Sequence, residues 1–268
     1  MKKQYLFVLG CLLLCAASCR YVVETGCAET VATGKGWALC SDNVLTITTV
    51  GKMPDYTVTP REFLAPWFEL RDDINSVIIG NKVTYIGSYS FFRCENMTGV
   101  TIGDSVTAIG YKAFCDTGLT SVTVPTSVTT INDGAFASCI NMTSITIPNS
   151  VTEMGNGTFY DCVGLISVVI PNSMTAIGHE AFYACSGLIS VTIPSSVNVI
   201  DYFAFHGCSS LAEIINYSSV PQNIENNVFI GVDKDNCILY VPAEHVETYG
   251  KANVWKEFAN IRAISDPS

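Results

Sequence analysis

Charged residues are scarce in this chain: they make up 14% of its 268 residues, and histidine occurs only three times. Between positions 76 and 220 there are three Lys/Arg and nine Asp/Glu residues. The formal net charge is −10, and an acidic surface attracts neither nucleic acid nor an anionic membrane. We therefore expect no nucleic-acid partner.

Motifs of catalysis are also missing. His179, His206 and His245 have no regularly placed acidic partner, and no Ser or Cys lies in a nucleophile-elbow motif. The glycines are spread along the chain instead of being gathered in a phosphate-binding loop. We therefore predict that the protein is not an enzyme and has no cofactor and no metal site.

The only long apolar run lies at the N-terminus and is too short for a transmembrane helix. Lys2 and Lys3 precede the apolar stretch 5–14, and the small residues of AASC end it at Cys19. This order resembles a bacterial lipoprotein signal and implies that residues 1–18 are a signal peptide and that Cys19 is the site of lipid attachment. Ordinary secretion with cleavage near Ser18 is the alternative.

What the chain does contain is a repeat. One phenylalanine recurs at steps of 22 to 24 residues, at Phe91, Phe114, Phe136, Phe159, Phe182, Phe205 and Phe229. A fixed period in the twenties is typical of a solenoid, in which each coil buries its apolar face only against its neighbours. We call the residues at equivalent positions of successive repeats a column. Fold and function must therefore be considered one column at a time.

Each repeat opens with an alternating run such as SVTV at 121–124, which predicts a short strand with one buried face. In four repeats a proline follows and ends the strand, because it has no N–H for a ladder. The positions of these strands that face outward are Ser121, Thr123, Ser144, Thr146, Ser167, Val169, Ser190 and Thr192. We call this set the strand face.

A second alternating run follows in each repeat. Its last column holds Gly87, Gly110, Asn132, Gly155, Gly178 and Asp201. Gly, Asn and Asp are the residues that best tolerate positive φ. We therefore expect a left-handed turn at this column.

Cysteines occupy another column, one per coil: Cys94, Cys139, Cys162, Cys185 and Cys208, with a one-residue deletion near Cys115. A zinc site needs four ligands at short spacings, which this column lacks, so we predict small apolar core residues. Cys27 and Cys40 lie outside the repeats of an exported chain. Oxidation is permitted there, and a disulfide between these two is as consistent with the sequence as two free thiols.

The unit L-x-x-V-x-I-P-x-S-V-x-x-I-G-x-x-A-F-x-x-C, nearly intact at 165–185, resembles the BspA-like leucine-rich repeat family of bacterial cell-surface proteins. GKMPDY at 51–56 and APWF at 65–68 resemble its N-terminal cap, and LYVPAEHVETYGKANVWKEFANI at 239–261 its C-terminal cap. The resemblance implies a mainly β leucine-rich-repeat solenoid of about seven coils. The corresponding division is 19–73 for the N-terminal cap, 74–232 for the solenoid and 233–268 for the C-terminal cap.

The same resemblance implies an extracytoplasmic binding or adhesion protein whose ligand is a protein or a glycan, of host origin in some members. It places the protein at the outer membrane or cell surface of a Gram-negative, Bacteroidetes-like bacterium, in contact with the membrane only through a lipid anchor. A structural or assembly component of the envelope, without an external ligand, is the alternative function.

Two surfaces are candidates for binding. The strand face offers flat rows of hydroxyls and methyls, and leucine-rich repeats commonly bind there. The other candidate is a turn edge that carries aromatic side chains and could stack sugar rings: Tyr111, Tyr160, Tyr183, Tyr202 and His206. Because the strand face is the more regular of the two, we expect binding there.

Overall fold

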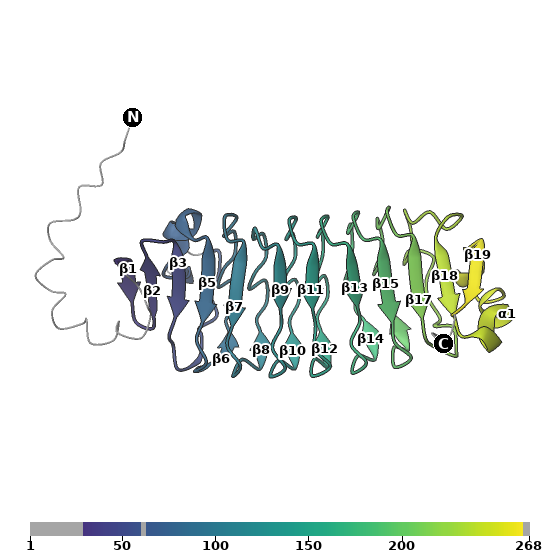
Figure 1. Cartoon of the computed structure of the whole chain (residues 1–268), viewed down its shortest axis with the longest axis horizontal. Coiled ribbons are helices and arrows are strands. Elements are labelled where there is room, and N and C mark those ends of the chain that lie inside the picture. The colour runs from purple at the N-terminus through teal and green to yellow at the C-terminus, as the bar shows by residue number, and fades with distance from the viewer. Residues whose placement is uncertain (1–28, 60–62, 265–268) are drawn as a thin grey trace, which may run out of the picture.

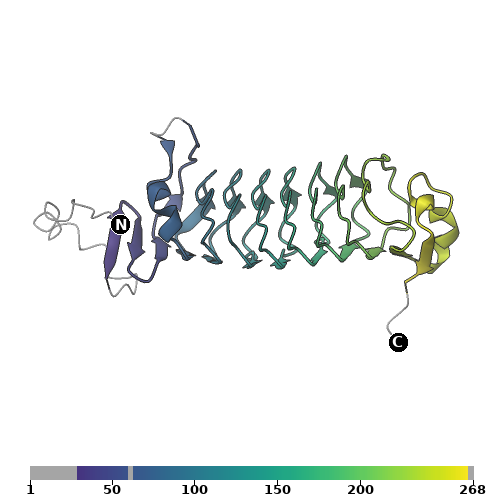
Figure 2. The ribbon, with the colours of Figure 1, turned by 90° about the horizontal axis from the view of Figure 1, so that it is seen from above.

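A computed structural model describes residues 29–59 and 63–264. The chain forms a parallel β-solenoid of about eight turns with little helix. The coils follow one another along a straight, elongated body, with the N-terminal cap at one end and the C-terminal cap at the other (Figures 1 and 2). The predicted fold class is therefore confirmed.

The first run of each repeat supplies one strand to the first wall of the solenoid. Parallel partners are equivalent residues of successive repeats, as where Ser121 pairs with Ser144 and Val122 with Ile145. The strands of this wall are β3 (Val44–Ile47), β5 (Ser76–Ile79), β7 (Gly99–Ile102), β9 (Ser121–Thr123), β11 (Ser144–Thr146), β13 (Ser167–Val169), β15 (Ser190–Ile193), β17 (Glu213–Asn216), β18 (Ile238–Val241) and β19 (Asn260–Ala263).

The second run supplies a second wall of shorter strands. These are β4 (Gly51–Lys52), β6 (Val83–Ile86), β8 (Ala108–Ile109), β10 (Thr130–Ile131), β12 (Glu153–Met154), β14 (Ala176–Ile177) and β16 (Val199–Ile200). They pair in parallel in the same way, as where Ile131 is matched with Ile109 on one side and Met154 on the other.

The phenylalanine column forms the centre of the core. All seven rings are fully buried, and successive centroids lie 5.2 to 5.8 Å apart with nearly parallel planes. Trp67, which precedes Phe91 by 24 residues, stacks on it at 5.7 Å. The N-terminal cap therefore contributes an eighth ring to the column, which explains why the solenoid has one coil more than the phenylalanines alone predict.

The prediction of a left-handed turn at the glycine column is wrong. Positive φ occurs two residues after that column, at residues such as Lys112 and Gly134, and again six residues after it, at residues such as Asp161 and Gly207. At members of the column such as Gly87, glycine is instead required for lack of space, because a Cβ on Gly87 would lie 1.7 Å from the carbonyl oxygen of Pro54. Asn and Asp share the column for local hydrogen bonds, as where Asn132 Nδ2 donates to the carbonyl of Ile109 at 2.8 Å.

The N-terminal cap is an antiparallel hairpin joined to the first wall. It consists of β1 (Thr30–Gly34) and β2 (Trp37–Cys40), and β2 pairs with β3, which in turn pairs in parallel with β5. A 3₁₀ turn, η3 (Phe68–Asp73), follows Trp67. The indole N–H of Trp67 donates to the carbonyl of Ser90 at 2.7 Å and attaches the cap to the next coil.

The C-terminal cap consists of short turns, η4 (Ala243–His245), α1 (Val246–Tyr249) and η5 (Trp255–Glu257), followed by β19. Its buried aromatic residues Tyr249, Trp255 and Phe258 close the last coil, and the rings of Trp255 and Phe258 contact Phe229. Parallel pairing continues into both caps, so it marks no boundary, and the predicted division at 74 and 233 stays a prediction.

The irregular segment NYSSVPQNIENN is the part of the last coil that receives this cap. Asn216 replaces the aliphatic residue of its column, is fully buried, and donates from Nδ2 to Gln222 Oε1 at 2.9 Å. The side-chain amide of Gln222 in turn donates to the carbonyl of Val197. The backbone carbonyl of Gln222 accepts the indole N–H of Trp255 at 2.9 Å. A buried polar network therefore joins the solenoid to its C-terminal cap.

The spatial explanation of the glycine column predicts different costs at two of its members. A Cβ on Gly155 would lie 2.4 Å from the backbone nitrogen of Asp133, whereas the nearest atom to a Cβ on Gly178 is a side-chain oxygen at 3.1 Å. We expect Gly155→Ala to lower the free energy of unfolding by about 1 to 3 kcal/mol through overpacking. Gly178→Ala should change it by less than about 0.5 kcal/mol. Urea denaturation of both variants checks this, and equal costs would refute the spatial explanation.

Candidate functional site: the strand face

The strand face is largely open to solvent. Ser121, Thr123, Ser144, Thr146 and Ser167 are exposed, and Val169 reaches an exposed fraction of 65%. Ser190 and Thr192 of β15 are half-buried. The inward neighbours Val122 and Val168 are buried, so the alternation that the sequence predicts positions each outward side chain.

The structure arranges these residues in two groups. Ser121 and Thr123 lie opposite Ser144 and Thr146 in the β9–β11 pair. Ser167 and Val169 lie opposite Ser190 and Thr192 in the β13–β15 pair. Within the described residues, β11 and β13 belong to different sheets. The predicted single row of hydroxyls is therefore two panels with an interruption between them.

A shallow groove of about 440 Å³ lies at this interruption. Ser144, Thr146 and Asn149 line it from one coil, and Ser167, Val169 and Asn172 from the next. None of its lining residues carries an ionisable side chain. Its chemistry is that of hydroxyls, amides and aliphatic groups, which suits hydrogen bonding and apolar contact but not the capture of a charged group.

The turn edge has a different geometry. Tyr160, Tyr183 and His206 follow one another in successive coils, with centroids 4.8 and 4.7 Å apart and planes within 2° of parallel. Both faces of the Tyr183 ring are therefore covered by its neighbours and are closed to a sugar ring. Tyr111 and Tyr202 lie in another column, three residues before the core phenylalanine, and are partly exposed, at 39% and 49%.

Apolar side chains border the strand face, which the sequence reasoning did not predict. Ile166 and Ile189 directly precede β13 and β15, and their side chains are 48% and 49% exposed. Their backbones are joined by a hydrogen bond from Ile189 N to Ile166 O at 2.8 Å, so they lie side by side. In the three preceding coils this column is threonine: Thr98, Thr120 and Thr143. The change from threonine to isoleucine in this column is the sequence signal that could have predicted the apolar border.

The cysteine column is core, as predicted from its spacing. Each of four thiols lies 3.0 to 3.2 Å from the carbonyl oxygen of the phenylalanine in the preceding coil, as where Cys185 Sγ donates to Phe159 O. In the repeat with the deletion, the column residue is Thr117, three residues after Phe114, and Cys115 lies outside the column. Thr117 donates its hydroxyl to Phe114 O at 2.9 Å.

Burial keeps most of these thiols protonated. It raises the pKa of Cys94 and of Cys208 to about 12, and it raises the pKa of Cys162 and Cys185 well above the ordinary value. At Cys139, burial acts in the same direction, but hydrogen bonds from Cys162 and Thr117 outweigh it and lower the pKa. The column is therefore a hydrogen-bonded packing element and lacks the exposure that a reactive thiol needs.

Other predicted sites fall partly outside the described residues. Cys19 and Cys27 lie outside them, and the lipid site stays a prediction. Cys40 is disulfide-bonded, but a pairing with Cys27 stays a prediction as well. Within residues 29–59 and 63–264, no group of three or more His, Cys, Asp or Glu is placed to hold a metal ion. The same ranges contain no helix long and apolar enough to cross a membrane.

Comparison with known families gives a match over most of the chain. The family described as "BspA type Leucine rich repeat region" matches residues 65–189 and 107–236, with six copies. No curated protein matches the chain in sequence.

A similar solved structure supports the fold. A leucine-rich repeat protein from T. pallidum is 22% identical with a TM-score of 0.56, over 67% of this chain and 90% of that one. A leucine-rich repeat protein from Eubacterium ventriosum is 23% identical with a TM-score of 0.42, over 77% of this chain and 75% of that one. At 22% identity, the similarity to the T. pallidum protein supports the fold and says nothing about function.

The burial of the thiols makes a prediction about their reactivity. Iodoacetamide at pH 8 should leave the seven buried free thiols of residues 29–59 and 63–264 unmodified in the folded protein and should alkylate them after unfolding in guanidinium, as measured by intact mass. Rapid labelling of Cys185 or Cys208 in the folded protein would contradict this account.

Burial of the thiols also predicts how stability depends on pH. Because the pKa of Cys94 and Cys208 is about 12 in the folded state and about 8.5 in an unfolded chain, the free energy of unfolding should fall as pH rises between these values.

Proposed function

Because the chain belongs to the BspA-type leucine-rich repeat family, we propose that it is a binding protein that acts outside the cytoplasm through its strand face. Leucine-rich-repeat solenoids are typically scaffolds for binding and not for catalysis. The observation that carries the proposal is the exposure of the outward positions of β9, β11 and β13. Parallel pairing holds β9 in register with β11, and β13 in register with β15.

The comparison with the turn edge supports the same surface. The rings of Tyr160, Tyr183 and His206 contact one another, so their packing already accounts for their presence. Ser144, Thr146 and Ser167, in contrast, project into solvent from strands that are each paired with a neighbour. Regular side chains on a rigid scaffold lose little conformational entropy when a ligand binds them.

The composition of the surface indicates the class of ligand. The groove between β11 and β13 has no ionisable side chain, and Ile166, Ile189 and Val169 add exposed aliphatic surface beside it. Exposed apolar groups bordered by polar ones are typical of interaction sites. The ligand that fits is an uncharged region of a protein or of a glycan, including one of host origin.

A binding screen with charged variants tests the proposed function. The chain is screened against host matrix proteins, mucin and neutral glycans, and each hit is measured again with Thr146→Arg and Ser167→Arg. We expect both variants to weaken binding at least about tenfold, because an arginine blocks the face and brings an unpaired charge against an uncharged ligand.

The matched control for the binding screen is Thr152→Arg, an exposed threonine on the second wall, which should bind normally. Tyr160→Ala, Tyr183→Ala and Tyr202→Ala should have smaller effects than the two strand-face variants. The reverse ranking would move the site to the turn edge. Absence of any ligand would favour the alternative function as a structural component of the envelope.

The location of the protein is proposed from its N-terminus. The signal-like segment 1–18 and Cys19 support a lipoprotein at the outer membrane or surface of a Gram-negative, Bacteroidetes-like bacterium. We expect mass spectrometry of the native protein to find a lipid-modified Cys19 as the first residue, and Cys19→Ser to release the protein from membranes. An unmodified N-terminus and identical fractionation of Cys19→Ser would refute the anchor.

A further inference from the structure

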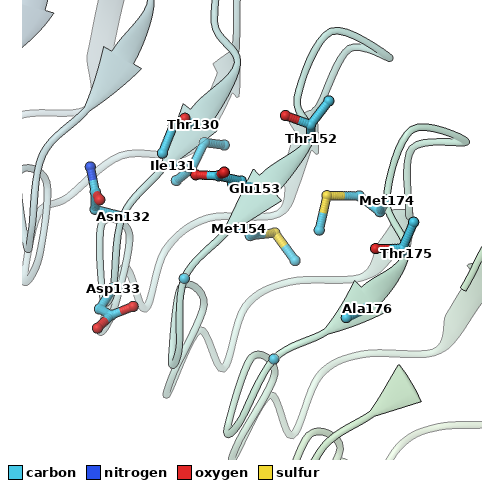
Figure 3. Close-up of a pocket in the computed structure, with 12 residues that line it drawn as sticks. Thr130, Ile131, Asn132, Asp133, Thr152, Glu153, Met154, Met174, Thr175 and Ala176 are labelled. Carbon is cyan, nitrogen blue, oxygen red and sulfur yellow. The ribbon is translucent and has the colours of Figure 1, made fainter. Parts of the chain in front are cut away.

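A second groove crosses the second wall of the solenoid. It has a volume of about 370 Å³ and is lined by three successive coils, those of β10, β12 and β14 (Figure 3). Two of its lining residues carry carboxylates, Glu153 and Asp133, and none is a lysine or an arginine. We call it the second-wall groove. It lies away from the strand face, and its charge distinguishes it from the uncharged groove there.

From β6 to β16, Glu153 is the only charged side chain in its column. It projects outward from β12 and is exposed. The equivalent outward residues are Tyr85, Ala108, Thr130, Ala176 and Val199. Thr130 and Ala176, in the two neighbouring coils, are short, and Figure 3 shows the Glu153 side chain extended toward β10. Among residues 29–59 and 63–264, Glu153 has no ion-pair partner. Its charge is therefore available to a cation from outside.

Asp133 supplies a second carboxylate from the preceding coil. It is exposed, and its Oδ1 accepts a hydrogen bond from Asn156 N at 2.8 Å. In the part of the chain that the structure describes, Asp133 has no ion-pair partner either. Lys112, one coil earlier, instead has its Nζ 5.3 Å from the centre of the Tyr111 ring. Two negative charges therefore share the groove without a counter-ion, on a protein of net charge −10, and their field attracts cations.

The floor of the second-wall groove is apolar. Met154 and Met174 line it and are 8% and 3% exposed, and Figure 3 shows their side chains between the coils. The equivalent inward residues are isoleucine at Ile86, Ile109, Ile131, Ile177 and Ile200, and valine at Val83, Val106, Val128, Val151 and Val197. Methionine is unbranched and polarisable, so it adapts to an inserted aliphatic chain better than a stiff β-branched residue does. The floor therefore suits methylene groups.

A backbone carbonyl adds a further acceptor to the groove. On the second wall, Ile131 O accepts a hydrogen bond from Gly155 N at 2.8 Å, and Ile177 O accepts one from Asp201 N at 2.9 Å. Met154 O occupies the same position in its coil, but within the described ranges β12 and β14 are not paired and this oxygen accepts no hydrogen bond. The groove therefore offers an oxygen beside its apolar floor that can accept from a ligand.

We propose that the second-wall groove binds a lysine side chain of a partner protein. The methylene stem lies on the thioethers of Met154 and Met174, and the ammonium group pairs with Glu153, while Asp133 adds to the attraction. Lysine side chains bury their stems on apolar surface in this way and keep the charged head at a polar rim. The three donors of an ammonium match separate acceptors, here two carboxylates and Met154 O, better than the planar fork of arginine does. The proposal concerns a different surface from the strand face and does not depend on its ligand.

Methyl NMR of the full chain, labelled with ¹³C at the methionine methyl groups, tests the groove. The probe is the blocked peptide acetyl-Gly-Lys-Gly-amide. It should shift the methyl signals of Met154 and Met174 saturably and should not move those of Met53, Met97 and Met142, which are buried in other coils. The same peptide with Nε-acetyl-lysine should shift none of them, because acetylation removes the charge. Equal shifts with the two peptides, or unmoved Met154 and Met174 signals, would overturn the proposal.

Variants that remove one charge separate the groove from general attraction to an acidic protein. Glu153→Gln keeps the shape of an exposed side chain and should weaken binding of the lysine peptide at least about tenfold. The matched control is Glu95→Gln, which removes an exposed carboxylate in the coil of Phe91 and should bind normally. Thr146→Arg on the strand face should also bind normally, so this test is independent of the proposed function. If Glu153→Gln binds as tightly as the wild type, or Glu95→Gln weakens binding as much, the proposal is wrong.

Discussion

The structure depends on the stacking of one aromatic ring per coil. Seven phenylalanines and Trp67 form a continuous buried column in which each ring contacts the next at 5.2 to 5.8 Å. No single coil of 22 to 24 residues can bury such a ring alone, so each coil is stable only between neighbours. The caps satisfy the same requirement, since Trp67 and Trp255 end the stack and donate their indole N–H groups to the adjacent coils.

This dependence separates the two sides of each strand. Inward positions such as Val122 and Val168 are constrained by the stack, whereas outward positions such as Thr146 and Ser167 are free to serve a ligand. It also explains the low charge of the repeats, because a charge at an inward position could not be paired between identical coils. Function is therefore to be sought on surfaces, and the strand face is the surface that packing explains least.

The sequence predicted the features that repeat and missed those that depend on space between coils. The phenylalanine period, the strand alternation and the cysteine column predicted coil, walls and core. The reason for glycine at positions such as Gly87 could not be predicted, because it is set by the carbonyl of a residue 33 positions earlier, Pro54. The interruption of the strand face between β11 and β13 was also missed.

The most direct test of this account is the stability of Phe159→Ala, measured by equilibrium denaturation against Thr146→Ala as the exposed control. If the ring column holds the coils together, the free energy of unfolding should fall by about 3 to 5 kcal/mol for Phe159→Ala. The control should lose less than about 0.5 kcal/mol. A loss below about 1 kcal/mol at Phe159 would contradict the central role of the column.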